Sequence, residues 1–494
     1  MNNELVSLNP ATGVELGRVP VTGLDVVPAI VARARQAQQR WAATDLKQRR
    51  SFLTHWRRIL ARDAESWADL IRDEIGKPRC EAFAGDVIAS LDAMRWTVRH
   101  GPGELARRRF GSGHQRFLTI PGGRLEYRPY GVIGILGTWN YPLFLNAPVI
   151  AQALLAGNAV VWKPSELAPL SGQKLQRSLE EAGIPIGLVS AVQGGPEQGA
   201  ALIKADINKG VFTGAVVNGR RVLGALAVRG ISAVAELSGF DPAVVLADAP
   251  RDSTVKALAW SAFVGAGQTC VAVKRVIVVG DPAPWAEALA KLAKTLRVGD
   301  PARSEIDVGP LISESARTRV HDLVRAAVGA GAEVLAGGEP APGPGWFYPP
   351  TVMQGDGKAE AALASVFGPV VIVRGVADIE TAVRAVNSSS YGLAASVWSR
   401  DVRTAQKIAD RLEAGTVTIN EAVTPTMHAS APFGGVKASG FGRARGAFGL
   451  HELAQPHVVF TRRAGGFRPN LFPYKRMPVD SFLRIYRRLF HRAK

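Results

Sequence analysis

Short apolar runs alternate with longer amphipathic stretches over most of the chain beyond residue 131. The runs are rich in Val, Ile and Ala and have the length of buried strands. The stretches between them carry apolar residues at helical spacing. Strands separated by helices indicate parallel βαβ units, so we expect two α/β domains in series. The predicted strands are 132–136, 158–162, 188–192, 210–213, 232–235, 243–246, 273–279, 370–373 and 416–419.

The first 130 residues show a different pattern. Residues 5–20 predict a pair of short strands, and residues 26–75 predict helices with apolar positions between basic ones. A second helical stretch is expected over 80–100. Residues 101–123 are rich in Arg and Gly and predict a loop, and the alternation over 117–130 predicts an exposed hairpin.

Composition excludes several classes of protein. The chain has 494 residues, of which 47% are hydrophobic and 21% charged, so it is a globular chain with room for two or three domains. Its two cysteines, Cys80 and Cys270, exclude a disulfide framework and favour a reduced, cytoplasmic compartment. The apolar stretch 131–162 is interrupted by polar and turn residues, which favours buried core over a membrane span. The eight His are scattered, and we expect no metal site.

Cys270 is the first candidate for chemistry. It follows Gly265-Ala266-Gly267-Gln268-Thr269 and precedes an apolar strand. A thiol after a glycine-rich turn can face a cleft and act as a nucleophile. A buried structural cysteine is an equally good local interpretation.

Two further residues and two segments are each ambiguous when taken alone. Glu236 ends a predicted strand and would face the ligand crevice of an α/β sheet, or else be a surface carboxylate. Asn140, before Tyr141-Pro142, is either a turn residue or an amide donor to an oxyanion. The segments 163–166 and 214–219 each follow a strand and could meet ribose or phosphate groups.

Taken together, seven motifs resemble those of the aldehyde dehydrogenase superfamily, in the family's order, over about residues 9–460. The spacing from Glu236 to Cys270 also fits the family. The motifs are Trp139-Asn140-Tyr141-Pro142-Leu143, Lys163-Pro164-Ser165-Glu166, Phe212-Thr213-Gly214, Glu236-Leu237-Ser238-Gly239, Gly267-Gln268-Thr269-Cys270, Val366-Phe367-Gly368-Pro369-Val370 and Pro432-Phe433-Gly434-Gly435-Val436-Lys437-Ala438-Ser439-Gly440.

The resemblance implies NAD(P)-dependent oxidation of an aldehyde to a carboxylic acid. In it, the Cys270 thiolate attacks the aldehyde carbon, and the Asn140 amide and the Cys270 N–H hold the oxyanion. Glu236 activates the water that hydrolyses the resulting thioester. Coenzyme A-acylating relatives usually lack this Glu, so its presence favours release of the free acid.

The family pattern also implies a set of cofactor contacts. Lys163 and Glu166 would meet the adenosine ribose, and the carboxylate of Glu166 favours NAD, with NADP left open. Phe367 would border the nicotinamide ribose. The residues assigned to the cofactor are Trp139, Lys163, Glu166, Gly214, Gly219, Leu237 and Phe367.

Three positions depart from the family pattern. Ser365 stands where a Glu usually binds the nicotinamide ribose, and Ala215 where a Ser or Thr is common. Phe240 replaces the Lys of the family's Glu-Leu-Gly-Gly-Lys. The first two changes remove polar contacts to the cofactor, and we expect weaker cofactor binding.

The fold implied is a Rossmann-like cofactor domain, an α/β catalytic domain and a small β oligomerisation arm. The expected boundaries are 1–115 with 131–237 for the cofactor domain, 238–454 for the catalytic domain, 116–130 with 455–463 for the arm, and 464–494 for a tail. Homo-oligomers, dimers or tetramers, are the family norm.

The tail concentrates positive charge. Of a net charge of +18, residues 462–494 supply +9, from ten Lys or Arg against Asp480. Residues 481–494 predict an amphipathic basic helix, too short to span a bilayer but suited to an anionic membrane surface or to docking on a protein surface. Such tails resemble those of long-chain aldehyde dehydrogenases, which favours a hydrophobic medium- to long-chain aldehyde. The expected substrate loop 421–431 lacks Arg and Lys, which argues against an acidic semialdehyde.

Two other functions stay open at this point. The departures at the cofactor site and the high charge suit a non-catalytic scaffold or binder of anionic polymers, although nucleic acid is not the expected partner. A coenzyme A-acylating enzyme is the third interpretation.

Overall fold

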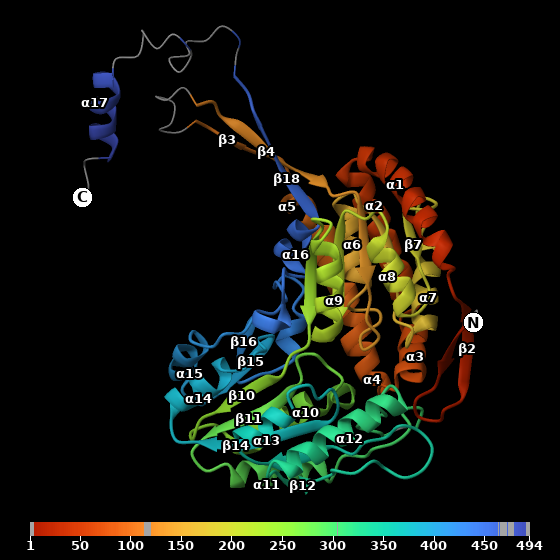
Figure 1. The fold of residues 1–494 in the computed structure, drawn as a ribbon, viewed down its shortest axis with the longest axis vertical. Helices are drawn as coiled ribbons and strands as arrows, with labels where there is room; N and C mark the ends of the chain where they lie inside the picture. The colour runs from red at the N-terminus through yellow and green to blue at the C-terminus, as the bar shows by residue number, and fades with distance from the viewer. Residues whose placement is uncertain are drawn as a thin grey trace. The chain divides into compact units, whose positions relative to one another are not determined.

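The computed structural model describes residues 4–112, 120–303, 305–462, 464, 472 and 479–490. These residues form two compact units (Figure 1). The larger unit comprises Met1–Glu104 and Pro129–Ala454, and the smaller comprises Leu105–Arg128 and Gln455–Lys494.

The larger unit contains a six-stranded sheet with the order β17-β9-β8-β5-β6-β7. Its strands are parallel except for β17, which pairs antiparallel with β9. The chain enters at β5, moves outward through β6 and β7, and returns to the other side of β5 for β8 and β9. Strand order therefore reverses between β5 and β8, where α/β folds bind ligands at the carboxyl ends of the strands. The strands are β5 (Val132–Leu136), β6 (Ala159–Lys163), β7 (Val189–Ala191), β8 (Lys209–Gly214), β9 (Ser232–Leu237) and β17 (Gly440–Phe441).

A second sheet of seven strands follows in the same unit, with the order β12-β13-β14-β11-β10-β15-β16. All neighbours are parallel except β12 and β13. The chain passes from the first sheet to the second between β9 and β10, because β9 ends at Leu237 and β10 begins at Asp241. The strands are β10 (Asp241–Val245), β11 (Val273–Val279), β12 (Glu333–Ala336), β13 (Thr351–Gln354), β14 (Val370–Val376), β15 (Ala394–Trp398) and β16 (Thr416–Ile419).

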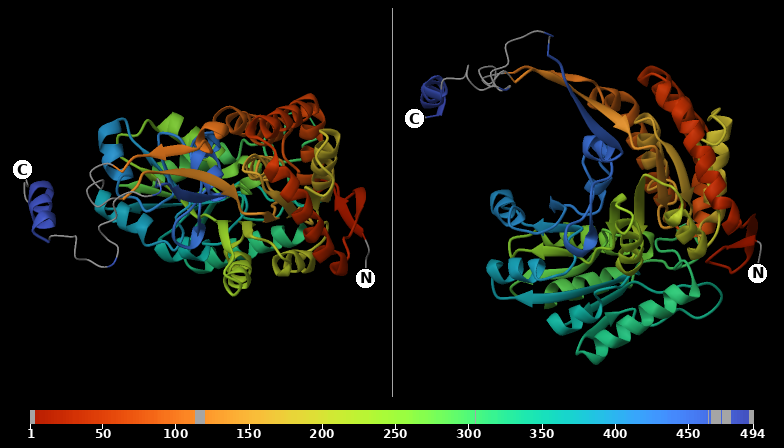
Figure 2. Two further views of the ribbon diagram at one scale, coloured as in Figure 1. Left: turned by 90° about the horizontal axis from the view of Figure 1, so that it is seen from above. Right: turned by 45° about the horizontal axis from the view of Figure 1, so that its top comes forward.

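Both faces of the second sheet are buried, as expected for parallel strands. In β10, Ala243 and Val245 join a core with helices α10 to α13, whereas Val244 between them joins a second core with α14 and α15. This two-residue alternation explains why the strand sequences read as continuous apolar runs. The right-hand view of Figure 2 shows this green and teal part of the chain as one group beside the red-to-yellow helices.

The N-terminal helices form as the sequence predicts. Helix α2 begins at Asp45, whose carboxylate accepts from the Gln48 amide while the Gln48 side chain accepts from the Asp45 amide. Two of its apolar residues, Leu53 and Trp56, are fully buried. The preceding strands and the helices of this region are β1 (Glu4–Leu8), β2 (Glu15–Pro20), α1 (Val27–Ala43), α2 (Leu46–Arg62), α3 (Ala64–Ile75), α4 (Arg79–Glu81), the π-helix η2 (Ala82–Ile88) and α5 (Ala89–Glu104).

The remaining helices of the larger unit connect the strands of the two sheets. They are α6 (Ala147–Leu155), α7 (Pro169–Glu181), α8 (Pro196–Lys204), α9 (Val216–Ala227), α10 (Arg251–Phe263), α11 (Ala283–Ala293), α12 (Glu314–Gly329), α13 (Gly357–Ala362), α14 (Ile379–Asn387), α15 (Val402–Ala409) and α16 (Gly446–Glu452).

The smaller unit differs in part from the prediction. It contains a three-stranded sheet of β18 (Ala454–Phe460), β4 (Gly123–Pro129) and β3 (Arg108–Phe110), and the helix α17 (Val479–Phe490). The hairpin was expected within 117–130, but β4 pairs with β3, which lies inside the stretch predicted as a loop. Residues 117–119 lie outside the described residues. A three-residue strand between arginines carries too short a pattern to be recognised.

The predicted α/β fold class is confirmed, and the predicted late strand corresponds to β18. The division into cofactor domain, catalytic domain and arm stays a prediction, because the two compact units do not follow those boundaries. No helix in the described ranges combines the length and the apolar character needed to cross a membrane.

Candidate active site

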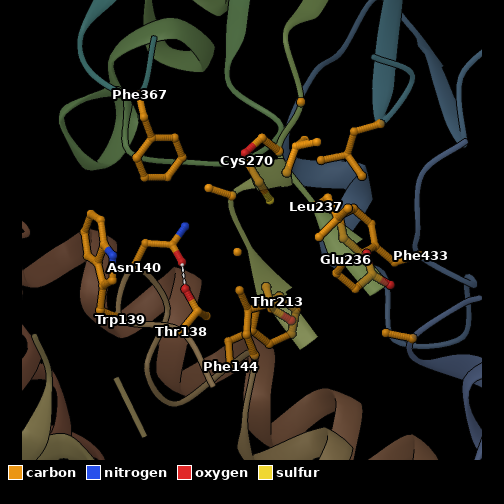
Figure 3. Close-up of a pocket in the computed structure, with 18 of the residues that line it drawn as sticks. Thr138, Trp139, Asn140, Phe144, Thr213, Glu236, Leu237, Cys270, Phe367 and Phe433 are labelled. Atoms are coloured by element: carbon orange, nitrogen blue, oxygen red, sulfur yellow. Dashed lines mark hydrogen bonds between the residues drawn. The ribbon is translucent and has the colours of Figure 1, made fainter. Parts of the chain in front are cut away.

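A cavity of about 510 Å³ in the larger unit brings the three predicted catalytic residues together. Asn140 follows β5, Glu236 lies in β9, and Cys270 precedes β11, so the cavity joins both sheets. Figure 3 shows the three side chains around one space. Trp139 and Phe367 lie on one side of Cys270 and Phe433 on the other.

The turn before Cys270 has an unusual backbone. Gly265, Ala266 and Gly267 have φ values of 62°, 53° and 67°, the left-handed region that L-residues rarely adopt. At Gly267 a Cβ atom would lie 2.1 Å from the Gly368 carbonyl oxygen, so only glycine fits. The turn therefore needs this sequence to deliver Cys270 to the cavity.

Buried side chains hold this turn from beneath. Lys274 donates to the carbonyls of Gly267 at 2.7 Å and Gly368 at 2.6 Å. The Gln268 side chain donates to the Gly265 carbonyl and accepts from the Ile312 amide. Burial lowers the pKa of Lys274 to about 7, because the two carbonyls compensate incompletely for lost hydration.

Asn140 is oriented at both ends of its amide. Its Oδ1 accepts from the Thr138 hydroxyl at 2.8 Å, which Figure 3 marks with a dashed line. Its Nδ2 donates to the Gln268 carbonyl at 3.0 Å, two residues before Cys270. An amide nitrogen has two hydrogens, so one stays available for an atom bound near Cys270.

A buried ion pair supports the segment after Asn140. Lys77 lies 2.7 Å from Asp86, and its Nζ stands 3.3 Å from the centre of the Tyr141 ring. Asp86 accepts from the amides of Leu143 and Phe144, and the Tyr141 hydroxyl is 2.8 Å from Thr269 Oγ1. The cluster thus links the Asn140 segment to the residue next to Cys270.

Glu236 is buried in β9, opposite Thr213 of β8 and Gly440 of β17. Within the described part of the chain, neither carboxylate oxygen has a hydrogen-bond partner. Burial raises the pKa of Glu236 to about 8, against the opposing effect of Arg445 and Arg443. A carboxyl group that titrates near neutral pH is suited to general acid–base work.

Cys270 lies in an environment that favours the neutral thiol. Burial, together with Asp241 and Glu236, raises its pKa to about 12, whereas Arg445 acts in the opposite direction. The reactive species of cysteine is the thiolate. The thiol therefore needs a base in the same cavity, and Glu236 lines it.

The predicted cofactor residues fall into two groups. The first group lines the cavity and consists of Trp139, Gly214, Leu237 and Phe367. The Trp139 and Phe367 rings meet edge to face, with their centres 5.8 Å apart. The other group does not line the cavity and is described next.

Lys163 binds Glu166 at 2.6 Å and the Gly194 carbonyl at 2.9 Å. Gly219 lies buried inside α9, where a Cβ would meet the Leu237 side chain at 2.5 Å. Gly219 thus lets α9 pack closely on β9, a use of glycine that the sequence does not distinguish from a phosphate contact.

The residues present fit a dinucleotide. Helix α9 begins at the cavity, at Val216, with no acidic residue in its first turn and no side-chain cap on its amides. Such a helix start favours a pyrophosphate. Ala215 and Ser365 also line the cavity, so two of the three departures from the family pattern lie where a cofactor would meet them.

Sequence reasoning missed two arginines of the cavity. Arg443 and Arg445 both line it, whereas the loop 421–431, expected to face the substrate, supplies none of its lining residues. The lack of Arg and Lys in that loop therefore does not bear on the charge of the cavity, whose lining includes two arginines close to Glu236. The signal was the sequence Gly442-Arg443-Ala444-Arg445-Gly446 directly after the last motif.

Comparisons with known proteins place this geometry in a family. The model of the family described as "Aldehyde dehydrogenase family" matches residues 1–459. The chain is 34% identical to 4,4'-diapolycopene aldehyde oxidase of Methylomonas sp. over 487 residues, with 97% of this chain and 90% of that protein covered. It is 35% identical to succinate-semialdehyde dehydrogenase of Paenarthrobacter nicotinovorans, with 89% and 96% covered. The chain therefore belongs to the aldehyde dehydrogenase family.

A solved structure agrees with this assignment. The aldehyde dehydrogenase of Mycobacterium tuberculosis complexed with NAD+ matches with a TM-score of 0.89 and 31% identity, over 94% of this chain and 96% of that chain. The predicted family is confirmed, and the complex agrees with the predicted NAD cofactor. The long-chain type is not distinguished by these relatives, whose names include both an acidic and a carotenoid aldehyde.

Proposed function

We propose that the protein oxidises an aldehyde to the free carboxylic acid with NAD(P), through a covalent intermediate on Cys270. The observation that carries this proposal is that Cys270, Glu236 and Asn140 line one cavity. Ring side chains of Trp139 and Phe367 lie at one end of it and Phe433 at the other, which leaves room for a cofactor and a substrate on opposite sides of the thiol.

The first step is attack of the Cys270 sulfur on the aldehyde carbon. The thiol proton passes to Glu236, whose pKa of about 8 makes it a competent base near neutral pH. The carbonyl oxygen becomes an oxyanion, held by the free hydrogen of the Asn140 amide and by the Cys270 N–H. Thr138 and the Gln268 carbonyl orient that amide before the substrate arrives.

The second step releases the product. Transfer of the hydride from the substrate carbon to a bound nicotinamide dinucleotide would leave a thioester on Cys270. Glu236 releases the proton it accepted to solvent and then removes a proton from water, whose oxygen attacks the thioester carbon. The carbon–sulfur bond breaks, and the Cys270 thiolate leaves as the acid forms. A buried Glu without a hydrogen-bond partner is free to turn from the thiol to the water.

A bound nicotinamide dinucleotide would accept the hydride from the substrate carbon. Trp139, Gly214, Leu237 and Phe367 would hold it along the cavity, and the start of α9 would meet its pyrophosphate. Lys163 and Glu166, paired with each other next to β6, would receive the adenosine ribose. The carboxylate of Glu166 favours NAD over a cofactor with a 2′-phosphate.

The preferred substrate is a hydrophobic, medium- to long-chain aldehyde. Phe144, Leu145, Pro148, Val149 and Phe433 line the cavity and supply a mainly apolar wall. The relatedness to a diapolycopene aldehyde oxidase agrees with this preference.

Helix α17 supports attachment to an anionic membrane surface from the cytoplasm. Leu483, Tyr486 and Phe490 are 43%, 55% and 56% exposed, and Arg487 and Arg488 are exposed beside them. An exposed apolar face with basic residues beside it is typical of helices that lie on a membrane.

The smaller unit supports a dimer or tetramer. In its three-stranded sheet, β18 and β3 are the two edge strands, and Phe110, Val458 and Phe460 are exposed. The centres of the Phe110 and Phe460 rings are 5.6 Å apart. Exposed apolar side chains on a small sheet favour pairing with a second copy.

The test is production of NADH and NADPH by purified protein with straight-chain aldehydes of increasing length. Cys270→Ala is the inactive control, and Cys80→Ala, at the exposed second cysteine, controls for loss of a thiol. Turnover that rises with the length of the aldehyde, is retained in Cys80→Ala and is lost in Cys270→Ala supports the proposal. Absence of turnover and of cofactor binding in the wild type would contradict it and favour a scaffold.

A further inference from the structure

The segment between β17 and α16 carries a residue whose conformation needs an explanation. Arg445 has φ 63° and ψ 169°. An L-residue avoids this region, which is almost reserved for glycine. Strain of this kind persists only where the surrounding structure enforces it, and it concentrates at functional sites.

The Arg445 side chain is buried although it is charged. It is 5% exposed. Its guanidinium carbon Cζ lies 5.0 Å from the centre of the Phe144 ring and 4.6 Å from the centre of the Phe433 ring. Arginine over an aromatic face is stabilised by the ring quadrupole, but a buried cation normally also has an anionic partner. In the residues that the structure describes, Nη1 of Arg445 has no hydrogen-bond partner.

A candidate partner for this charge lines the same cavity. Glu236 lines it with two carboxylate oxygens that likewise have no partner among the described residues. The charged or titratable side chains that line the cavity are Glu236, Cys270, Arg319, Tyr391, Arg443 and Arg445. Of the arginines, Arg445 has the largest effect on Glu236, ahead of Arg443, and both oppose the effect of burial on its pKa.

Arg443 and Arg445 differ in the hydrogen bonds that their guanidinium groups make. Arg443 Nη1 donates to the carbonyls of Gly435 and Gly442, which fixes its guanidinium to the backbone. Arg445 contacts two rings, and its buried Nη1 has no hydrogen-bond partner among the described residues. Its charge is therefore available to a carboxylate that moves within the cavity.

We propose that Arg445 is a positioning residue that acts through Glu236: it supplies a buried counter-charge that favours the ionised form of this carboxylate, and so raises the fraction of Glu236 that can accept a proton from the thiol and from water. This inference rests on the role of Glu236 in the proposed function. With this strained backbone, the Arg445 side chain contacts both Phe144 and Phe433.

The primary test compares the pH dependence of kcat in the wild type and in Arg445→Gly and Arg445→Lys. Arg445→Gly removes the charge and also relieves the backbone strain, so we expect a higher melting temperature together with an acidic limb shifted to higher pH. A shift of one pH unit lowers the rate about tenfold at neutral pH, because one tenth as much Glu236 is ionised. Arg445→Lys retains the charge and should restore most of the wild-type limb.

Two comparisons separate this role from a merely structural one. Arg443→Met removes the arginine that is bound to carbonyls, and should shift the acidic limb less than Arg445→Gly does. In a Glu236→Gln background, Arg445→Gly should have little further effect on kcat, because both changes remove the same function.

A direct measurement of Glu236 makes the test independent of turnover. The carboxyl band that is present in the wild type and absent in Glu236→Gln, seen in difference infrared spectra, should titrate at higher pH in Arg445→Gly. An unmoved band or an unmoved acidic limb overturns the inference. So does a defect confined to KM for carboxylate-bearing aldehydes, because Arg445 would then bind the substrate. Wild-type turnover that depends on Cys270 leaves the proposed function standing in either case.

Discussion

Asn140 donates from Nδ2 to the carbonyl oxygen of Gln268 at 3.0 Å, and this bond joins the end of β5 to the turn that presents Cys270. The bond connects the first sheet to the loop before the second sheet. It fixes the amide relative to the thiol before any substrate binds. Preorganised donors of this kind stabilise a developing oxyanion more than flexible ones.

Asn140→Ala should lower kcat by about 100- to 1000-fold, the usual cost of one oxyanion donor. Stopped-flow measurement of the first turnover of NADH isolates the step in which the oxyanion forms. Thr138→Val is the matched control, because it removes only the hydroxyl that orients the amide, and its effect should be smaller. Little or no loss of kcat in Asn140→Ala would show that Asn140 is not the donor.

Glu236→Gln should separate the two chemical steps. A glutamine can remove a proton neither from the thiol nor from water, so at neutral pH both the burst of NADH in the first turnover and the steady rate should fall. At alkaline pH, where hydroxide can deprotonate the thiol instead, the burst should return while the steady rate stays low. In the wild type, kcat should rise with pH through about 8, where Glu236 ionises. That limb should disappear in the variant, and its persistence would assign it to another group.

The same residue makes stability depend on pH. Burial raises the pKa of Glu236 from 4.5 to about 8 in the folded protein. Its contribution to stability is complete below the unfolded pKa and is lost as pH rises through the folded pKa. Melting temperatures should therefore fall less between pH 6 and pH 9 in Glu236→Gln than in the wild type, and parallel curves would contradict the buried, neutral carboxyl.

The Lys77–Asp86 pair should be costly to break from one side. Both side chains are buried, so Lys77→Met leaves an unpaired carboxylate and should cost about 3–5 kcal/mol in free energy of unfolding. Lys77→Met combined with Asp86→Leu removes both charges and should recover much of that loss. Denaturant unfolding measures both, and a double variant no more stable than Lys77→Met would argue against a charge effect.

Gly267→Ala should abolish activity or folding, because the new Cβ would overlap the Gly368 carbonyl oxygen. Gly265→Ala is the matched control in the same turn. It has a similar φ, but its Cβ would have its nearest contact at 3.4 Å, with Thr269 Oγ1. It should cost only the left-handed penalty of about 1–2 kcal/mol. Similar losses for both, measured by thermal unfolding and NADH production, would show that crowding at Gly267 is unimportant.

Removal of residues 479–494 should weaken binding to vesicles that contain phosphatidylserine, without loss of NADH production from short aldehydes. Binding of the full chain should weaken with salt, because basic residues contribute about 1 kcal/mol each near an anionic surface. Sedimentation with anionic and with neutral vesicles measures this. Equal binding of full-length and truncated protein would refute a membrane role for α17.

The sequence predicts the strands well where the sheet is buried on both faces. Val132–Leu136 and Val273–Val279 coincide with β5 and β11, because parallel strands read as continuous apolar runs. Strands β12, β13 and β15 were not predicted. The first two are only four residues long, and β15, Ala394–Trp398, includes Ser396.

Site residues that stand in a local sequence motif could be predicted, whereas a residue whose role depends on contacts with distant segments could not. Cys270, Glu236 and Asn140 could be predicted because each stands in a recognisable motif. Arg445 could not, because a buried arginine contradicts the usual reading of a charged residue, and its burial depends on the Phe144 and Phe433 rings from distant segments.

The most direct test of the account is the mass of the enzyme during turnover. Glu236→Gln incubated with NAD and a medium-chain aldehyde at alkaline pH, where hydroxide can deprotonate the thiol in place of Glu236, should accumulate an acyl group in thioester linkage, located by peptide mapping on the fragment that contains Cys270. Exposed Cys80 is present in the same molecule and should stay unmodified. An acyl group on Cys270 alone is the predicted result; no acyl group, or acylation of Cys80 instead, would contradict the assignment of Cys270 as nucleophile and Glu236 as the base for hydrolysis.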